Sequence, residues 1–197
     1  YEYYNAISRL SLVKNADAKS LNCYQPFLNT YIALNYYLMT SHWGGVPFVI
    51  EPITDLSTRI PRTSEDEILT KLSALLEDAM PDLEEKANDS FADVNSAFFV
   101  SKDVARVLLA YVYCNLKKWD KALPLLEKVA NNGYYSLTES NNVQYKNNSE
   151  CILGFELQTR SVSADEKSYY PCLDYKDVLL TTAECLYHTG NKAKAKE

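Results

Sequence analysis

Hydrophobic residues recur along much of this chain at the spacing of amphipathic helices. A wide apolar stripe over residues 24–41 predicts a long helix that ends at Gly44. A second helix is predicted to begin at Ser64, which forms a capping box with Glu67, and to reach about Met80. The residues predicted to form its buried face are Ile68, Leu69, Leu72, Leu75, Leu76 and Ala79.

The second half of the chain continues the helical pattern. Ser101 opens a predicted helix that reaches about Leu116, and another helix is predicted over residues 120–131. A last long helix is predicted over residues 175–189, and a further helix is predicted to begin near Lys192. The chain is therefore expected to consist mainly of helices.

Two apolar runs lack the helical spacing. The run at residues 151–158 predicts a buried strand. The run at residues 46–53 contains Pro47 and Pro52, which cannot donate backbone hydrogen bonds, so an extended connector is predicted there. Other segments predict a helix near residues 5–13 and polar loops at 88–95 and 159–168.

Small residues recur at a spacing that indicates a repeated helix pair. Ala110 and Ala122 flank a turn, with the large residues Tyr113 and Trp119 between them. Two antiparallel helices approach closely where small side chains face each other, and large side chains fill the adjacent grooves. The pattern resembles the tetratricopeptide repeat, with its clearest copy at residues 101–133. An incomplete final copy at residues 175–197 uses Ala183, Leu186, Gly190 and Ala195.

Composition and charge exclude several classes of protein. Only 5 of the 197 residues are glycine, which is too few for a turn-rich barrel or a glycine-rich phosphate loop. The formal net charge is −6 and no long basic run occurs, so nucleic acid is not an expected partner. No run approaches the roughly 18 apolar residues of a membrane-spanning helix. We therefore predict one all-α domain over residues 1–197, a tetratricopeptide-like helical-repeat scaffold with short extended segments.

The cysteines and histidines form no pattern typical of a metal or redox motif. The five cysteines contain no C-x-x-C pair and are Cys23, Cys114, Cys151, Cys172 and Cys185. Cys114 and Cys185 lie among apolar residues and are expected to be small buried hydrophobic residues, with a disulfide bond left open as an alternative. His42 and His188 are the only histidines, too few for a multi-histidine metal cage. No metal and no cofactor is predicted.

Eight short motifs follow one another along the chain in an informative order. They are HWGGVPFV at 42–49, RTSEDE at 62–67, SKDVA at 101–105, LAYVY at 109–113, WDKAL at 119–123, GYYSL at 133–137, GFELQ at 154–158 and YKDVLL at 175–180. In this order they resemble the SusD/RagB family of outer-membrane nutrient-uptake lipoproteins of the starch-binding type. The resemblance covers about residues 24–197.

The resemblance to the SusD/RagB family implies both a fold and a role. The implied fold is a helical-repeat scaffold that carries an irregular, glycan-facing half. The implied role is that of a surface-exposed outer-membrane lipoprotein, which captures oligosaccharides and passes them to a SusC-like TonB-dependent transporter. Attachment to the membrane would be through a lipid on an N-terminal cysteine only. Members of the family usually have several hundred residues, so the chain resembles a reduced or partial member.

Sugar binding requires aromatic faces, on which the C–H groups of a sugar ring stack, and polar side chains nearby. The candidate ligand-binding residues are His42, Trp43, Tyr169 and Tyr170. Trp43 is expected to pack within the Gly-Gly-Val-Pro connector that follows it, and Trp119 is expected to pack within the repeat. The two tyrosines lie in a polar stretch and are more open to a ligand.

The sequence shows no arrangement that indicates catalysis. A glycosidase needs two positioned carboxylates, and none of the 26 acidic residues is distinguished as such a pair. We therefore predict a non-enzymatic protein that binds oligosaccharides or other nutrients. The alternative is a tetratricopeptide-type scaffold that binds protein partners and does not bind glycans.

Overall fold

The structure is a computed structural model of the 197-residue chain. The residues whose backbone it describes are 18–50, 53, 57, 59–85, 100–138, 149–157 and 168–196. For residues 18–23, 156–157 and 168–170 the structure describes the backbone but not the side chains. The helix predicted near residues 5–13 and the loop predicted at 88–95 lie outside the described residues, as does the predicted loop at 159–168 except for its last residue.

The chain divides into two compact units, Tyr1–Leu83 and Glu84–Glu197. Each unit contributes its own set of fully buried hydrophobic side chains, such as Leu72 in the first and Leu108 in the second. A separate core is what allows a unit of this kind to be compact by itself. The single domain over residues 1–197 stays a prediction.

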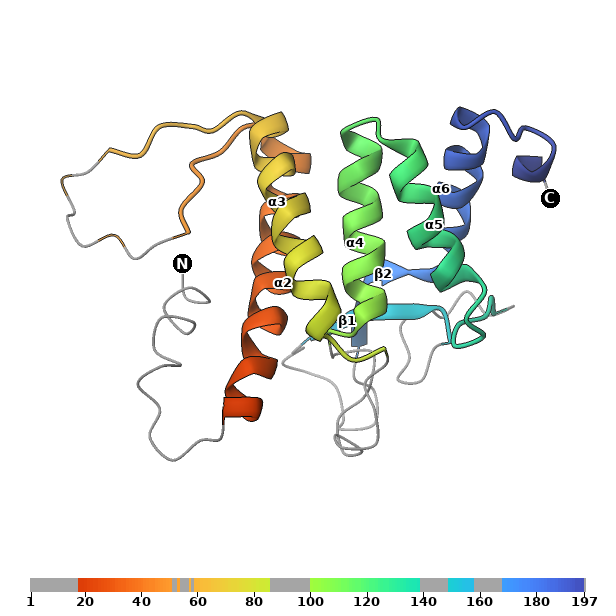
Figure 1. The fold of residues 1–197 in the computed structure, drawn as a ribbon, viewed down its shortest axis with the longest axis horizontal. Coiled ribbons are helices and arrows are strands. Elements are labelled where there is room, and N and C mark those ends of the chain that lie inside the picture. The colour runs from red at the N-terminus through yellow and green to blue at the C-terminus, as the bar shows by residue number, and fades with distance from the viewer. Residues whose placement is uncertain are drawn as a thin grey trace. The chain divides into compact units, whose positions relative to one another are not determined.

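The first unit is a pair of packed helices, α2 (Ala18–Trp43) and α3 (Glu65–Ala79), followed by the short 3₁₀ helix η1 (Met80–Asp82) (Figure 1). Both predicted long helices are confirmed, and α2 begins earlier than residue 24. Ser64 caps α3, because its hydroxyl accepts a hydrogen bond from the amide of Glu67 at 3.4 Å. The buried side chains of this unit, each at most 3% exposed, include Ile32, Ala33, Ile68, Leu69, Leu72 and Leu76.

Residues 46–50 form an extended connector, as the prolines of this segment predict. The ring of Tyr36 on α2 lies 4.6 Å from the ring of Phe48, measured between centroids. An isolated antiparallel bridge between Val46 and Thr63 joins the connector to the segment before α3. The connector is therefore attached both to α2 and to the start of α3.

The second unit contains three helices that lie side by side, α4 (Lys102–Asn115), α5 (Trp119–Ala130) and α6 (Tyr175–His188) (Figure 1). α4 packs on α5, and α5 packs on α6. All three confirm predicted helices. Ser101 caps α4 by accepting a hydrogen bond from the amide of Val104 at 3.4 Å. Where a further helix is predicted from Lys192, the structure has the short 3₁₀ helix η4 (Lys194–Lys196).

Two antiparallel strands, β1 (Cys151–Leu157) and β2 (Ser168–Asp174), form the only sheet among the described residues. β1 confirms the strand predicted at residues 151–158, whereas β2 was not predicted. β2 contains Pro171, which lies opposite Gly154 and cannot donate a hydrogen bond to a neighbouring strand. Proline is tolerated here because each strand of a two-stranded sheet has one edge without a partner.

The predicted helix pair at residues 101–133 is formed by α4 and α5. Ala110 and Ala122 are fully buried and Tyr113 is 5% exposed, as close packing at small residues requires. Trp119 begins α5, and its indole stacks on the imidazole of His188 with the ring centroids 4.2 Å apart. Trp119 therefore packs against α6, outside the predicted pair at residues 101–133, and assignment of the pair as a tetratricopeptide repeat stays a prediction.

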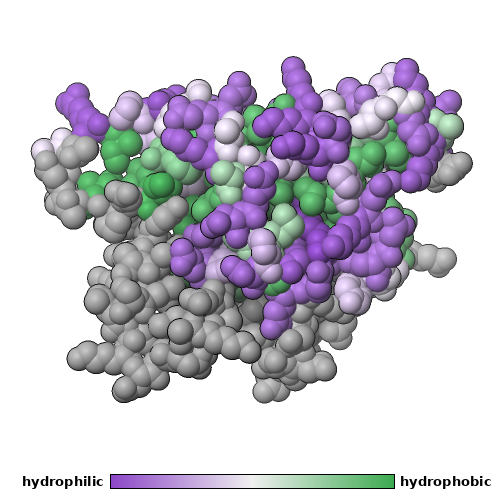
Figure 2. All heavy atoms as spheres, in the orientation of Figure 1, coloured by the Kyte–Doolittle hydropathy of each residue, from purple (hydrophilic) through white to green (hydrophobic). Residues whose placement is uncertain are grey.

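The described part of the chain is mainly helical, as predicted. None of its helices has both the length and the apolar character that crossing a membrane requires. On the face that Figure 2 shows, hydrophilic residues cover much of the described surface, and hydrophobic residues are visible between them. This mixture is ordinary for a protein surface, because polar atoms are too few to cover it completely.

Candidate functional site

His42 and Trp43, two of the four predicted ligand-binding residues, are the last residues of α2. The helix ends there because Gly44 adopts a left-handed backbone conformation with φ +65°. The Trp43 side chain is 66% exposed, so the prediction that it packs within the connector is wrong. The connector instead contacts Tyr36 and Thr63, which leaves the indole at the helix end accessible.

The exposed imidazole of His42 lies beside the indole of Trp43, with the ring centroids 5.7 Å apart and the planes at 44°. Its Nδ1 atom is 2.8 Å from the carbonyl oxygen of Leu38. A carbonyl oxygen only accepts hydrogen bonds, so Nδ1 carries the proton in the neutral ring and Nε2 is an acceptor. His42 therefore presents a hydrogen-bond acceptor next to an exposed aromatic ring.

Arg62 holds the turn that follows Trp43. Its Nε donates to the carbonyl oxygen of Gly45 at 2.6 Å, and its Nη2 donates to the carbonyl oxygen of Trp43 at 3.0 Å. Nη1 has no hydrogen-bond partner among the described residues. Gly45 lies so close to the facing backbone that a Cβ atom there would be 2.5 Å from the carbonyl oxygen of Thr63. The backbone below the indole is thus fixed by a guanidinium and by close chain packing.

We call His42, Trp43, Arg62 and Glu65 the α2-end cluster. Glu65 is the exposed first residue of α3, and its Oε2 atom lies 3.9 Å from where a Cβ of Gly44 would be. The cluster combines one exposed aromatic face with a carboxylate, an imidazole acceptor and guanidinium donors. A sugar presents C–H groups on its ring face and hydroxyls at its edge, so such a mixture suits a carbohydrate.

The other two predicted ligand-binding residues belong to β2 in the second unit. Tyr170 pairs with Phe155 across the sheet, and Tyr169 pairs with Glu156. The side chains of both tyrosines lie outside the described residues. Their role in ligand binding therefore stays a prediction.

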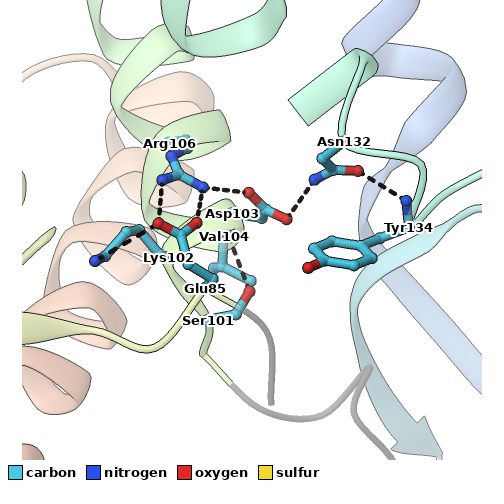
Figure 3. A network of polar contacts seen from close by, with 8 residues as sticks. All are labelled: Glu85, Ser101, Lys102, Asp103, Val104, Arg106, Asn132 and Tyr134. Carbon is cyan, nitrogen blue, oxygen red and sulfur yellow. Dashed lines mark hydrogen bonds and ion pairs between the residues drawn. The ribbon is translucent and has the colours of Figure 1, made fainter. Parts of the chain in front are cut away.

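A buried charged network at the start of α4 was not predicted from the sequence (Figure 3). Nη1 of Arg106 bonds to Oδ1 of Asp103 at 2.7 Å, and the guanidinium also holds the carboxylate of Glu85 with both Nη atoms, at 2.5 and 2.9 Å. Asn132 donates to the second oxygen of Asp103 at 2.8 Å. Asp103 and Arg106 are 1% and 4% exposed. The only local signal for this network is the three-residue spacing of Asp103 and Arg106 on one helix.

The charges of this network are shaped by burial and by mutual pairing. Burial raises the pKa of Asp103 above its ordinary value, although the hydrogen bond from Arg106 acts in the opposite direction. The hydrogen bond from Arg106 lowers the pKa of the more exposed Glu85. Asn132 in turn accepts a hydrogen bond from the amide of Tyr134 at 2.9 Å. The network therefore ties the start of α4 to the turn after α5, which is a structural role.

Metal binding has no support in the part of the chain that the structure describes. No group of three or more His, Cys, Asp or Glu side chains is arranged there to hold a metal ion. Cys185 is fully buried and Cys114 partly buried, which agrees with their predicted apolar surroundings. The prediction that the protein uses no metal and no cofactor stays a prediction.

The sequence matches no protein-family model and none of the curated proteins. The structure, in contrast, matches several solved structures. One is surface glycan-binding protein A from Bacteroides uniformis, with a TM-score of 0.80 and 15% identity over 98% of this chain and 61% of that protein. Another is a SusD-like protein from Bacteroides fragilis, with a TM-score of 0.82 and 12% identity over 98% of this chain and 63% of that protein.

A third match is a SusD superfamily protein from Bacteroides thetaiotaomicron, with a TM-score of 0.77 and 14% identity over 99% of this chain and 61% of that protein. The chain thus spans between 61% and 63% of the length of these three relatives. At such low identity the likeness concerns the fold. The chain has the mainly helical fold of SusD-like proteins, the family that the order of its sequence motifs resembles.

Proposed function

We propose that this protein binds glycans without chemically changing them, and that the α2-end cluster is part of the binding surface. The observation that carries the proposal is the exposed indole of Trp43 in a SusD-like fold. An exposed indole beside polar donors and acceptors offers a flat apolar face with hydrogen-bonding groups at its edge. A sugar ring stacked on this indole would cover it while its hydroxyls reach polar groups.

Each polar member of the cluster has a distinct task in this proposal. Nε2 of His42 accepts a hydrogen bond from a sugar hydroxyl, and the carboxylate of Glu65 accepts another. The unused Nη1 of Arg62 donates to a ring or hydroxyl oxygen. Arg62 also holds the carbonyl of Trp43, so this one residue would both bind the sugar and position the backbone that carries the indole. The polar groups would select the sugar, and the indole would supply most of the contact area.

The wider role in the proposal is capture at the outer membrane of a surface lipoprotein, followed by delivery to a SusC-like TonB-dependent transporter. Support comes from the order of sequence motifs and from relatives of the same fold, one of which is described as a surface glycan-binding protein and another as a laminarin-binding SusD-like protein. Finding a lipoprotein signal in the complete gene and a transporter gene beside it would support this role. Absence of both would contradict it.

The experiment for glycan binding is calorimetric titration with a panel of soluble polysaccharides and oligosaccharides, including laminarin and starch. We expect at least one of these glycans to bind, and we expect Trp43→Ala to weaken that binding about tenfold or more. Tyr24→Ala is the matched control, because Tyr24 is also exposed (55%) but lies near the opposite end of α2 from Trp43. The affinity of this control variant for the glycan should equal that of the unmodified protein.

Two results would overturn the proposal. One is that no glycan of the panel binds, and the other is that Trp43→Ala binds as tightly as the unmodified protein. Chromatography of the glycans after long incubation tests the non-enzymatic part, since a hydrolase would release shorter products. Tyr169→Ala and Tyr170→Ala in the same titration test whether β2 contributes to binding.

A second candidate function, a scaffold for protein partners, is favoured by one surface of α6. Leu180 is 68% exposed and Tyr187 is 54% exposed, and their seven-residue spacing places them on one side of the helix. Exposed apolar residues on one helix face are typical of helix-in-groove recognition. Calorimetry discriminates between the two functions: binding to oligosaccharides but not to partner peptides would exclude this candidate.

A further inference from the structure

Two cysteines that lie 71 residues apart in the sequence meet in the second unit. The Sγ atom of Cys114, near the end of α4, is 3.5 Å from the Sγ atom of Cys185 on α6. Both thiols are free in this structure. Disulfide bonds have sulfur atoms about 2.05 Å apart, so the two atoms need to approach by only about 1.5 Å to form one.

The two thiols differ in their access to solvent. Cys185 is fully buried, whereas Cys114 is partly exposed and lies one residue before the end of α4. The chain reverses direction just beyond, at Lys117, which has a left-handed φ of +57°. Of the two residues, Cys114 is therefore the one in contact with solvent. Among the charged side chains, Glu184 acts on both thiols.

The sulfur–sulfur contact also changes the acidity of the thiols. The hydrogen bond with Cys114 lowers the pKa of Cys185, although burial acts in the opposite direction. The same hydrogen bond raises the pKa of Cys114, and burial adds to that rise. Thiolates are the nucleophiles of disulfide exchange, so each cysteine must lose its proton before it attacks. The hydrogen bond exists only in the dithiol form, so the order of attack rests on the position of the two residues.

We propose that Cys114 and Cys185 form a redox-active dithiol, which closes to a reversible disulfide bond by exchange with an external disulfide such as glutathione disulfide. The argument rests on the sulfur–sulfur distance, on the partial exposure of Cys114, and on the burial of Cys185. No comparable sulfur contact joins the other two described cysteines, Cys151 and Cys172. The proposal is independent of the glycan-binding proposal, because the α2-end cluster belongs to the other unit.

The exchange takes place in two balanced steps. First, the thiolate of Cys114 attacks one sulfur of the external disulfide, which forms a mixed disulfide and releases the other half as a thiolate. Second, the thiolate of Cys185 attacks the sulfur of Cys114, which forms the internal bond and releases the second half. The protons of the two cysteines pass through solvent to the released thiolates. The protein is oxidised by two electrons, and the external disulfide is reduced to two thiols.

A bond between these residues would change the stability of the second unit. α4 and α6 each pack on α5, so the disulfide would connect the two outer helices of this group. It would also close a loop of about 70 residues, and constraining a long loop removes conformational freedom from the unfolded chain. We expect the oxidised protein to have a Tm about 5–10 °C above that of the reduced protein.

The test equilibrates the protein with glutathione buffers of increasing oxidised fraction, with a dithiothreitol-reduced sample as reference. Mass spectrometry of a non-reduced digest should show a peptide in which Cys114 is linked to Cys185, together with the rise in Tm. The Cys185→Ser variant should retain a glutathione adduct on Cys114 and show no such rise. The Cys172→Ser variant is the matched control and should form the linked peptide like the unmodified protein.

Several outcomes would overturn the proposal. Absence of the linked peptide in the most oxidising buffer would show that the helices cannot bring the sulfurs together. A linked peptide that forms only when urea is added would show that the bond forms in unfolded molecules and not in the folded protein. A glutathione adduct that persists on Cys114 of the unmodified protein would show that Cys185 does not resolve the mixed disulfide.

Discussion

The hydroxyl of Tyr36 exchanges two hydrogen bonds with the backbone of Val49: it accepts from the amide at 2.7 Å and donates to the carbonyl oxygen at 3.0 Å. In a sheet, a neighbouring strand would provide both partners. Here one side chain of α2 provides them to a connector beside which, among the described residues, no strand runs along this stretch. Tyr36 is 8% exposed, and its contact with Val49 is partly buried. It fixes the connector that follows the α2-end cluster.

We predict that Tyr36→Phe lowers the free energy of unfolding by about 1–3 kcal/mol, because it leaves the partly buried amide and carbonyl of Val49 without this partner. Urea denaturation followed by circular dichroism measures this loss. Tyr24→Phe is the matched control, since Tyr24 is 55% exposed on the same helix, and its effect should be close to zero. Equal losses for the two variants would contradict the role given to Tyr36.

Local sequence signals were sufficient to predict most helix boundaries. Ser64 and Ser101 cap α3 and α4 as predicted, because capping depends on residues within one turn of the helix end. Gly133 has a left-handed φ of +76° just after α5, as a glycine following a helix predicts. These features need no information from distant parts of the chain, and the mainly helical fold follows from them.

The features that were missed depend on contacts between distant residues. Asn132 meets Asp103 from 29 positions away, and Cys185 meets Cys114 from 71 positions away. The exposure of Trp43 depends on where the connector runs after the glycine turn, and local pattern does not determine that course. β2 was missed for a local reason. Its proline is unfavourable in most strands, but a two-stranded sheet tolerates a proline because each strand has a free edge.

We predict that Arg106→Ala lowers the free energy of unfolding of the second unit by about 3 kcal/mol, because it leaves the buried carboxylate of Asp103 without its cation. Lys71→Ala is the control for loss of an ion pair. The bond of Lys71 to Glu67, at 2.7 Å, joins side chains that are 47% and 56% exposed, so its loss should cost about 0.5 kcal/mol or less. Thermal or chemical denaturation measures both variants. Similar losses of stability for Arg106→Ala and Lys71→Ala would contradict the structural role given to the buried network.

The pKa of Asp103 predicts a specific dependence of stability on pH. Because its pKa in the folded protein is raised above 3.8, the folded state binds a proton more readily than the unfolded state. The stabilising effect of that proton is complete below the unfolded pKa and is lost as pH rises through the folded pKa. Relative to Asp103→Asn, the unmodified protein should therefore become more stable as pH falls from 7 toward 4. The free energy of unfolding of the unmodified protein minus that of Asp103→Asn should therefore rise as pH falls. If this difference is constant or becomes smaller, the raised pKa is contradicted.

We predict that Arg62→Ala weakens glycan binding about five- to tenfold, even though Trp43 itself is unchanged. The variant loses two hydrogen bonds to the carbonyls of Trp43 and Gly45 and one free donor of the α2-end cluster. Arg59→Ala is the matched control, because Arg59 is an exposed arginine of the same segment. Calorimetric titration with the glycan that binds the unmodified protein measures both variants. If Arg59→Ala weakens glycan binding as much as Arg62→Ala does, the loss comes from the change in net charge, and the positioning role of Arg62 is contradicted.

The reactivity of Cys151 provides a test of the surroundings of β1. Burial, assisted by the nearby charge of Asp174, raises the pKa of the Cys151 thiol to about 11. The thiolate is the reactive form, so at pH 8 its alkylation should be roughly a hundredfold slower than that of an ordinary cysteine with pKa near 8.5–9. Between pH 7.5 and 9.5 the rate at Cys151, followed by mass spectrometry with iodoacetamide, should rise about tenfold per pH unit without levelling. In urea-unfolded protein the same cysteine should react faster, and its rate should level off above the ordinary pKa of a thiol. Identical rate profiles in the folded and unfolded protein would contradict a buried thiol.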